Sequence, residues 1–223
     1  MILERVELLT ANLSETKSFY KDVLELELVE DREDTFIVQA GATQIRFEAT
    51  REYDRPFYHF ALNIPENQFR EAKSWIQSRA SLIQEEGDDE VFFTSWNAHS
   101  VYCEDPSGNI VEFIARHNLP NAISRPFHSR EIQGVSEIGV VVHEVIPFVR
   151  TLNGIGLPNW KEDSEGLTPV GVEHGLLIVV RKGRTWFFSN QKPAEYYPLR
   201  VTIQGIGRMT FVEDSTFVIE QAP

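Results

Sequence analysis

The 223-residue sequence has one cysteine, few basic residues and no long apolar run. A single cysteine, Cys103, excludes an intrachain disulfide. Lysine and arginine number 21 against 34 acidic residues, and the net charge of −13 argues against nucleic acid and anionic membrane surfaces as partners. No stretch of about 20 apolar residues, the length of a transmembrane helix, is present, and no signal peptide precedes the strand expected at 2–9. These absences predict a cytoplasmic protein.

The segment 101–114 predicts a strand, a tight turn at 105–108 and a second strand. Proline in the turn sets φ, and glycine tolerates the positive φ that such turns often need. In the returning strand Glu112 alternates with Val111 and Phe113, so it is a carboxylate in the middle of an otherwise apolar strand. A carboxylate in that position needs a charged partner, a metal or water-filled space.

An alternating strand followed by a helix recurs along the chain with matching spacing. The copies are 5–12 with 13–24, 59–66 with 67–76, and 137–144 with 145–152. A fourth, poorer copy begins at Arg200, where 205–207 is Gly-Ile-Gly instead of a helix start. Internal repeats of this kind determine an architecture, and four modules of roughly 50 residues account for nearly all of the chain.

Other elements follow from local pattern. Strands are expected at 26–30, 35–39, 44–49, 176–180 and 185–189. The stretch 160–172 resembles a loop, and Cys103 is expected in the core because it lies in an apolar strand.

These motifs resemble the vicinal oxygen chelate superfamily, which includes glyoxalase I, fosfomycin and bleomycin resistance proteins, and extradiol ring-cleaving dioxygenases. The family pattern Asp-Pro-x-Gly-Asn-x-x-Glu is matched from Asp105 to Glu112. Its first-helix pattern is matched by Asn12-Leu13, Thr16, Phe19-Tyr20 and Leu24-Glu25. The resemblance is specific over roughly residues 1–116, weaker over 132–183 and weakest after 197.

The resemblance implies an α+β fold, in which tandem βαβββ modules pair into cupped mixed sheets of the glyoxalase/dioxygenase type. We expect 1–116 to form the main cup from two paired modules and 117–131 to be a connector. Residues 132–223 are expected to form a second, degenerate half whose fourth module has lost its helix. Relatives commonly dimerise through their sheets, so a homodimer is possible.

In the family, metal ligands come from the first position of a module's leading strand and from the glutamate of its last strand. Carried over to this chain, the second module supplies His59 and Glu112. The first module supplies Arg5 and Arg46, so the N-terminal cup is expected to combine two cations with His59 and Glu112. The corresponding positions of the second half are Glu137, Val179 and Arg200, which places Glu137 opposite Arg200.

Arginine is always protonated and cannot ligate a divalent metal, so the metal site is expected to be degraded. Glu7, on the same strand face as Arg5, is a possible third ligand beside His59 and Glu112. The cofactor is therefore either none or a single divalent metal: Fe, Mn, Zn or Ni. The residues expected to contact a ligand are Arg5, Arg46, Asn63 and Tyr102.

Three functions remain open. In the first, the protein binds a small molecule in the N-terminal cup without a complete metal site, as bleomycin resistance proteins do. The alternative is an active metal-dependent dioxygenase of extradiol type, or a lyase, that uses His59 and Glu112 as catalytic residues. A second alternative is a metal-free acid–base catalyst, with Glu112 or His59 as the base beside an arginine oxyanion site.

Overall fold

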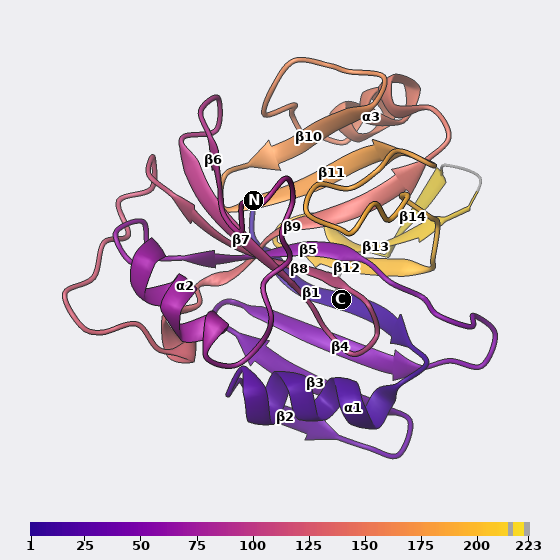
Figure 1. Ribbon diagram of the computed structural model, residues 1–223. Helices are drawn as coiled ribbons and strands as arrows, with labels where there is room; N and C mark the ends of the chain where they lie inside the picture. Colours follow the sequence, from indigo (N-terminus) through magenta and orange to yellow (C-terminus); the bar gives the residue numbers. More distant parts are fainter. Residues whose placement is uncertain (214–215, 221–223) are drawn as a thin grey trace.

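The computed structural model describes residues 1–213 and 216–220, and their strands form two seven-stranded mixed sheets (Figure 1). Sheet A contains, in spatial order, β14 (Thr216–Glu220), β13 (Gly207–Val212), β12 (Leu199–Ile203), β1 (Leu3–Thr10), β4 (Thr43–Ala49), β3 (Thr35–Ala40) and β2 (Glu27–Asp31). Sheet B contains β10 (Leu167–Val172), β11 (Gly175–Arg181), β9 (Gly134–Val142), β5 (His59–Ile64), β8 (Ile110–Arg116), β7 (Ala98–Glu104) and β6 (Val91–Phe93).

A helix follows each of the first three leading strands, as the repeats predict. After β1 come α1 (Leu13–Ser18) and a π-helical turn η1 (Phe19–Val23); after β5 comes α2 (Phe69–Gln77); after β9 comes α3 (Val145–Gly154). A short 3-10 turn, η2 (Ser129–Glu131), precedes β9. The helices bury apolar residues at helical spacing, for example Phe69, Ala72 and Ile76 on α2. One continuous buried cluster combines these side chains with residues of both sheets, including Cys103.

The fourth module has no helix between its first two strands. Residues 204–206 form a turn, and β12 pairs directly with β13 as an antiparallel hairpin. Gly205 takes a φ of 78°, which glycine adopts without steric cost. The expected loss of the fourth helix is therefore confirmed. The local predictions at 160–172 and 185–189 are wrong: the first contains β10, and the second is an irregular loop with positive φ at Phe188.

The modules pair differently from the expectation. β1 pairs with β12, so sheet A combines the first and the fourth modules. β5 pairs with β9, so sheet B combines the second and the third modules. Figure 1 shows the indigo β1 beside the yellow C-terminal strands. The expected cup formed by the first two modules is therefore wrong. The division of the chain at the connector does not coincide with the division between the sheets.

Contacts at the start of β9 hold this arrangement in place. Gln133 donates its backbone N–H to Asn63 O (2.8 Å), and Gln133 O accepts from Ala42 N (2.9 Å). Gly41 approaches so closely that a Cβ there would lie 2.2 Å from the Gln133 carbonyl carbon. The chain entering β9 is thus fixed between β5 and the β3–β4 turn of sheet A.

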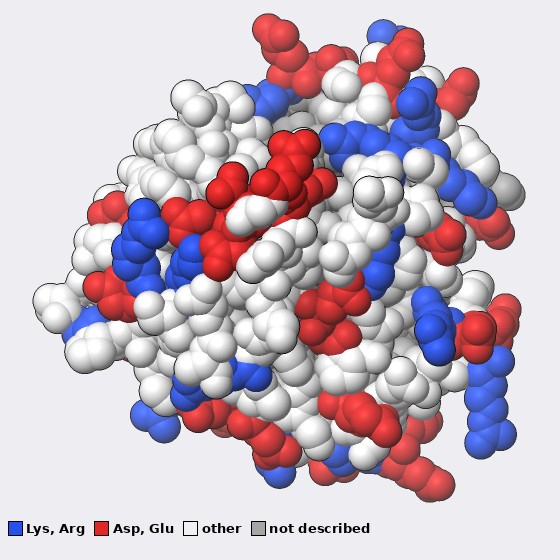
Figure 2. Space-filling view, viewed as in Figure 1, with Lys and Arg blue, Asp and Glu red and all other residues white. Residues whose placement is uncertain are grey.

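Among residues 1–213 and 216–220, none of the helices is long and apolar enough to span a membrane. On the face shown in Figure 2, basic side chains are interspersed with acidic ones.

Candidate metal and ligand site in sheet B

Three buried ligand-type side chains converge on sheet B: His59, Glu112 and Glu137, here called the His–Glu–Glu cluster. Ala61 explains why they meet, because it is paired with Glu112 on one side and with Glu137 on the other. His59 lies two residues earlier on the same strand and therefore faces the same way. Its Nε2 lies 3.5 Å from Glu112 Oε2 and 4.0 Å from Glu137 Oε2.

The Asp-Pro-Ser-Gly turn sets the position of Glu112. Asp105 Oδ1 accepts hydrogen bonds from the backbone N–H groups of Ser107 and Asn109, both at 2.9 Å. Tyr20 Oη donates to Asp105 Oδ2 at 2.8 Å and so ties the first helical segment to the turn. Gly108 has a φ of 85°, as the sequence pattern predicts. β8 therefore leaves the turn in a fixed register that places Glu112 beside Ala61.

Neighbouring side chains fix the two carboxylates. Ser100 Oγ donates to Glu112 Oε1 at 2.5 Å. Arg116 forms an ion pair with Glu137 and is itself completely buried. Its guanidinium carbon lies 5.4 Å from the Trp96 ring centre and 5.6 Å from that of Trp160. Arg116 therefore neutralises Glu137 through Oε1, and the other carboxylate oxygen, Oε2, is the one that lies towards His59.

The buried environment shifts the ionisation of all three members. Burial lowers the pKa of His59 to about 4, and the Ile110 backbone opposes this shift only in part. Burial, and then repulsion by Glu137, raise the pKa of Glu112; Ser100 and Arg116 act against them. Burial likewise raises the pKa of Glu137, opposed by Arg116. His59 is thus a neutral imidazole near pH 7, the form that ligates metals, and the adjacent carboxylates repel each other unless a cation or proton lies between them.

The cluster fits a single divalent cation. The three donor atoms lie within 4.8 Å of one another. With metal–ligand bonds of about 2.0–2.2 Å, adjacent donors should be about 3–3.5 Å apart, so only small side-chain rotations are required. The fourth family position faces the cavity as Ile178, opposite Gly139; the expected Val179 lies in the core. Isoleucine cannot ligate, so at most three protein ligands would be present and the remaining positions would face the cavity.

The cluster opens into a cavity of about 290 Å³, here called the sheet B cavity. Its lining is His59, Phe93, Trp96, Tyr102, Glu112, Glu137, Leu167, Ile178, Arg184, Trp186 and Phe187. The Trp186 ring centre lies 4.9 Å from that of His59. Gly139 makes room for it, because a Cβ there would lie 2.7 Å from Trp186 Cη2. The cavity thus has a polar floor and largely aromatic walls, the usual composition of a small-molecule site.

The structure separates the residues that the sequence analysis placed in one cup. Tyr102 lines the cavity with His59 and Glu112. Asn63 does not line it; its Nδ2 donates to Gln133 Oε1 at 3.2 Å. Arg5, Arg46 and Glu7 lie in sheet A and line a different pocket. The expectations that these arginines and Glu7 lie beside His59 are wrong, because the second carboxylate beside His59 is that of Glu137.

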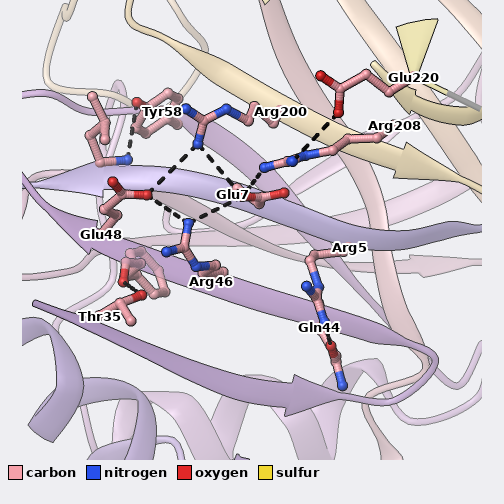
Figure 3. Close-up of polar contacts among 12 residues, drawn as sticks. Arg5, Glu7, Thr35, Gln44, Arg46, Glu48, Tyr58, Arg200, Arg208 and Glu220 are labelled. Carbon is pink, nitrogen blue, oxygen red and sulfur yellow. Dashed lines mark hydrogen bonds and ion pairs between the residues drawn. The ribbon is translucent and has the colours of Figure 1, made fainter. Parts of the chain in front are cut away.

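In sheet A, an ion-pair network joins Glu7, Glu48, Arg46, Arg200 and Arg208, here called the arginine cluster, whereas Arg5 bonds separately to Gln44 (Figure 3). Glu7 Oε2 lies 2.9 Å from Arg208 Nη2, 3.2 Å from Arg46 Nη1 and 3.7 Å from Arg200 Nη1. Arg46 also donates to Glu48 at 2.6 Å. Arg200 therefore lies opposite Glu7, and the expected opposition of Glu137 and Arg200 is wrong.

Sequence reasoning missed three contributors to the sheet B site. Glu137 aligns with a family ligand position, but the repeat pattern places it in another cup. Arg116 follows Glu112 at a spacing of four along β8, so the same alternation places it on the cavity-facing side. Trp186 lies in a loop, where no periodic signal identifies its direction.

Comparisons with known proteins give one family. A family model described as "Glyoxalase/Bleomycin resistance protein/Dioxygenase superfamily" matches residues 2–113. A comparison with curated proteins gives no significant match. A putative dioxygenase from Bacillus subtilis is 14% identical, with a TM-score of 0.56 over 88% of this chain and 65% of that chain. A V278E mutant of glyoxalase I from Zea mays is 14% identical, with a TM-score of 0.52 over 81% and 66%. This chain thus spans less than two thirds of either protein, and at such identity the likeness shows the fold alone.

Proposed function

This chain belongs to the glyoxalase/bleomycin resistance protein/dioxygenase superfamily, and on that premise we propose that it binds a small organic molecule in the sheet B cavity beside one divalent metal ion. His59, Glu112 and Glu137 would hold the metal. The observation that carries the proposal is the convergence of a neutral imidazole and two buried carboxylates on the floor of an aromatic-walled cavity. The protein would then act as a metal-dependent enzyme.

This proposal replaces the interpretation of a degraded site. That interpretation depended on two arginines beside His59, and both arginines lie in sheet A. The only guanidinium bonded to the His–Glu–Glu cluster in the described chain is that of Arg116, which contacts the outer oxygen of Glu137. An outer partner of this kind orients a ligating carboxylate without taking its place. These contacts support the alternative of a metal-dependent enzyme that uses His59 and Glu112, with Glu137 in place of Glu7 as the third ligand.

The chain's own residues have distinct tasks in this proposal. Ser100 and Arg116 hold the two carboxylates, and burial keeps His59 neutral. The aromatic walls limit water around a bound ligand. A metal ion in this position supplies Lewis-acid chemistry, because it polarises the oxygen atoms of a bound ligand.

A metal-free acid–base function has one specific observation in its favour. The pKa of Glu112 is raised by burial and by Glu137, which moves this carboxyl towards the range of a general base or acid near neutral pH. The two proposals differ in what occupies the space between the carboxylates: a metal ion in the first and a proton in the second.

Metal analysis separates them. Protein purified without chelators or a metal-binding tag is assayed by mass spectrometry of its metals, and we expect one metal ion per chain. Glu137→Gln should lose the metal because a ligand anion is removed. The matched control is Glu7→Gln, which removes a buried carboxylate of sheet A and should retain the metal. Metal-free wild-type protein, even after anaerobic loading with Fe(II), Mn(II), Ni(II) and Zn(II), would contradict the proposal and favour the acid–base function.

A further inference from the structure

Arg184 lines the sheet B cavity without an acidic partner. Its Nη1 donates to the backbone oxygen of Thr185 at 3.1 Å, and its guanidinium carbon lies 5.4 Å from the Phe187 ring centre. Within residues 1–213 and 216–220, none of the ion pairs includes Arg184. Burial alone accounts for the lowering of its pKa, with no carboxylate acting against it. This guanidinium is therefore partly removed from water without a counter-charge from the chain.

Arg116, a second arginine of the same region, differs from Arg184 because it has an acidic partner. Arg116 is buried against Glu137, so its charge is neutralised by the chain itself. A partly buried charge is unfavourable unless it is paired, and a guanidinium pairs best with the two oxygens of a carboxylate. The acidic chain, with 34 aspartates and glutamates, nevertheless provides Arg184 with none. The counter-charge that fits the cavity wall is that of a bound ligand.

The loop that carries Arg184 is held in place, so the guanidinium belongs to a preformed wall. Ala194 N donates to Arg184 O at 2.8 Å, and Trp186 N donates to Lys192 O at 3.0 Å. Phe188 N donates to Glu85 Oε2 at 2.9 Å and ties the loop to a segment of the second module. A preformed wall loses little freedom when a ligand binds.

The cavity also limits the rest of the ligand. A volume of about 290 Å³ is at the lower end of small-molecule sites, which suits a single ring with short substituents. Trp96, Trp186 and Phe187 present flat apolar surfaces, and rings stack on such surfaces in offset or edge-to-face contact.

From these observations we infer that the sheet B cavity takes a flat, single-ring ligand that carries a carboxylate, and that Arg184 determines this specificity by pairing with the carboxylate. The inference deepens the proposed function, on which it rests for the oxygen atoms that would face the His–Glu–Glu cluster. Arg184 is a specificity-determining residue of the wall and lies outside the proposed metal ligands.

Binding of two simple probes tests the inference. Benzoate and benzamide have nearly the same shape and differ in charge. Their affinities are measured by calorimetry, with quenching of tryptophan fluorescence as a second readout because two tryptophans line the cavity. We expect wild-type protein to bind benzoate about tenfold tighter than benzamide, since a charge-assisted pair is involved. Arg184→Gln should abolish this preference, Arg184→Lys should retain part of it, and the exposed control Arg181→Gln should leave it unchanged.

The design distinguishes failure of this inference from failure of the proposed function. Each protein is assayed as purified and after chelator treatment, and its metal content is measured on the same sample. A preference for benzoate that persists in Arg184→Gln, or that disappears only on chelation, would overturn the role of Arg184. Absence of benzoate binding in wild-type protein up to about 10 mM, well above the range of specific small-molecule sites, would also overturn it. Wild-type protein that contains no metal but still prefers benzoate would contradict the metal proposal alone.

Discussion

The two sheets of this molecule place opposite charges at equivalent positions. In sheet B, Glu112 lies opposite Ala61; in sheet A, Arg46 lies opposite Glu7 in the same parallel register. His59 in sheet B corresponds in the same way to Arg5 in sheet A. The backbone arrangement is thus shared, while Glu112 and its equivalent Arg46 carry opposite charges, and the neutral imidazole of His59 is replaced by the cation of Arg5.

The difference shows how one framework supports two kinds of polar interior. Ala61 leaves space between two carboxylates and a neutral imidazole, so sheet B has room for a cation. Glu7 fills the equivalent place in sheet A and provides a built-in anion for three arginines (Figure 3). An internal ion-pair network satisfies its own charges, whereas the His–Glu–Glu cluster requires something from outside: a metal ion or a proton.

The largest effect is expected from Arg116→Met, which breaks the sheet B charge balance at nearly constant volume. Glu137 would remain buried without its counter-charge, and losing one partner of a buried pair costs about 3–5 kcal/mol. Urea denaturation measures the change in unfolding free energy. Arg125→Met, which removes a solvent-exposed guanidinium from its pair with Glu131, is the control and should have a much smaller effect. Equal losses in the two variants would refute the buried-pair interpretation, and adding Glu137→Gln to Arg116→Met should recover part of the stability.

Glu7→Gln tests the ion-pair network of sheet A. It removes the anion shared by Arg46, Arg200 and Arg208, each partly exposed, so a loss of about 2 kcal/mol is expected from the charged hydrogen bonds. The same denaturation assay measures it, and metal content should stay at the wild-type value. A Glu7→Gln protein that loses its metal would show that the two sheets are not independent in the way their contacts indicate.

The smallest expected effect concerns pH. Because burial raises the pKa of Glu112 above its ordinary value, this carboxyl is protonated in the metal-free protein at a pH where it would be ionised in the unfolded chain. A metal needs the ionised form, so metal affinity should fall as pH falls, by up to about tenfold per pH unit, or about 1.4 kcal/mol. Calorimetry of zinc binding in buffers of different protonation enthalpy should show release of a proton at pH 7. If Glu112 is already ionised at pH 7, zinc binding should release no proton, and this result would contradict the prediction.

Most local features were predictable from the residues. Alternation identified the cavity-facing side of β8, and the turn from Asp105 to Gly108 follows from its proline and glycine. The helices after β1, β5 and β9 follow from apolar spacing. The loop around Trp186 was not predictable, because its direction depends on contacts with Lys192 and Glu85, which are distant or non-periodic in sequence.

The sequence by itself determined the repeated modules, the faces of their strands, the family and the placement of His59 and Glu112 on one face of the sheet. Only the tertiary structure decided which modules share a sheet, and with that whether Glu7 or Glu137 joins His59. The physical reason is that alternation is a local property with a period of two residues, while every leading strand presents a free edge that can pair with any other. Close contacts such as that of Gly41 with Gln133, far apart along the chain, select one pairing and thereby place an acid or an arginine in each site.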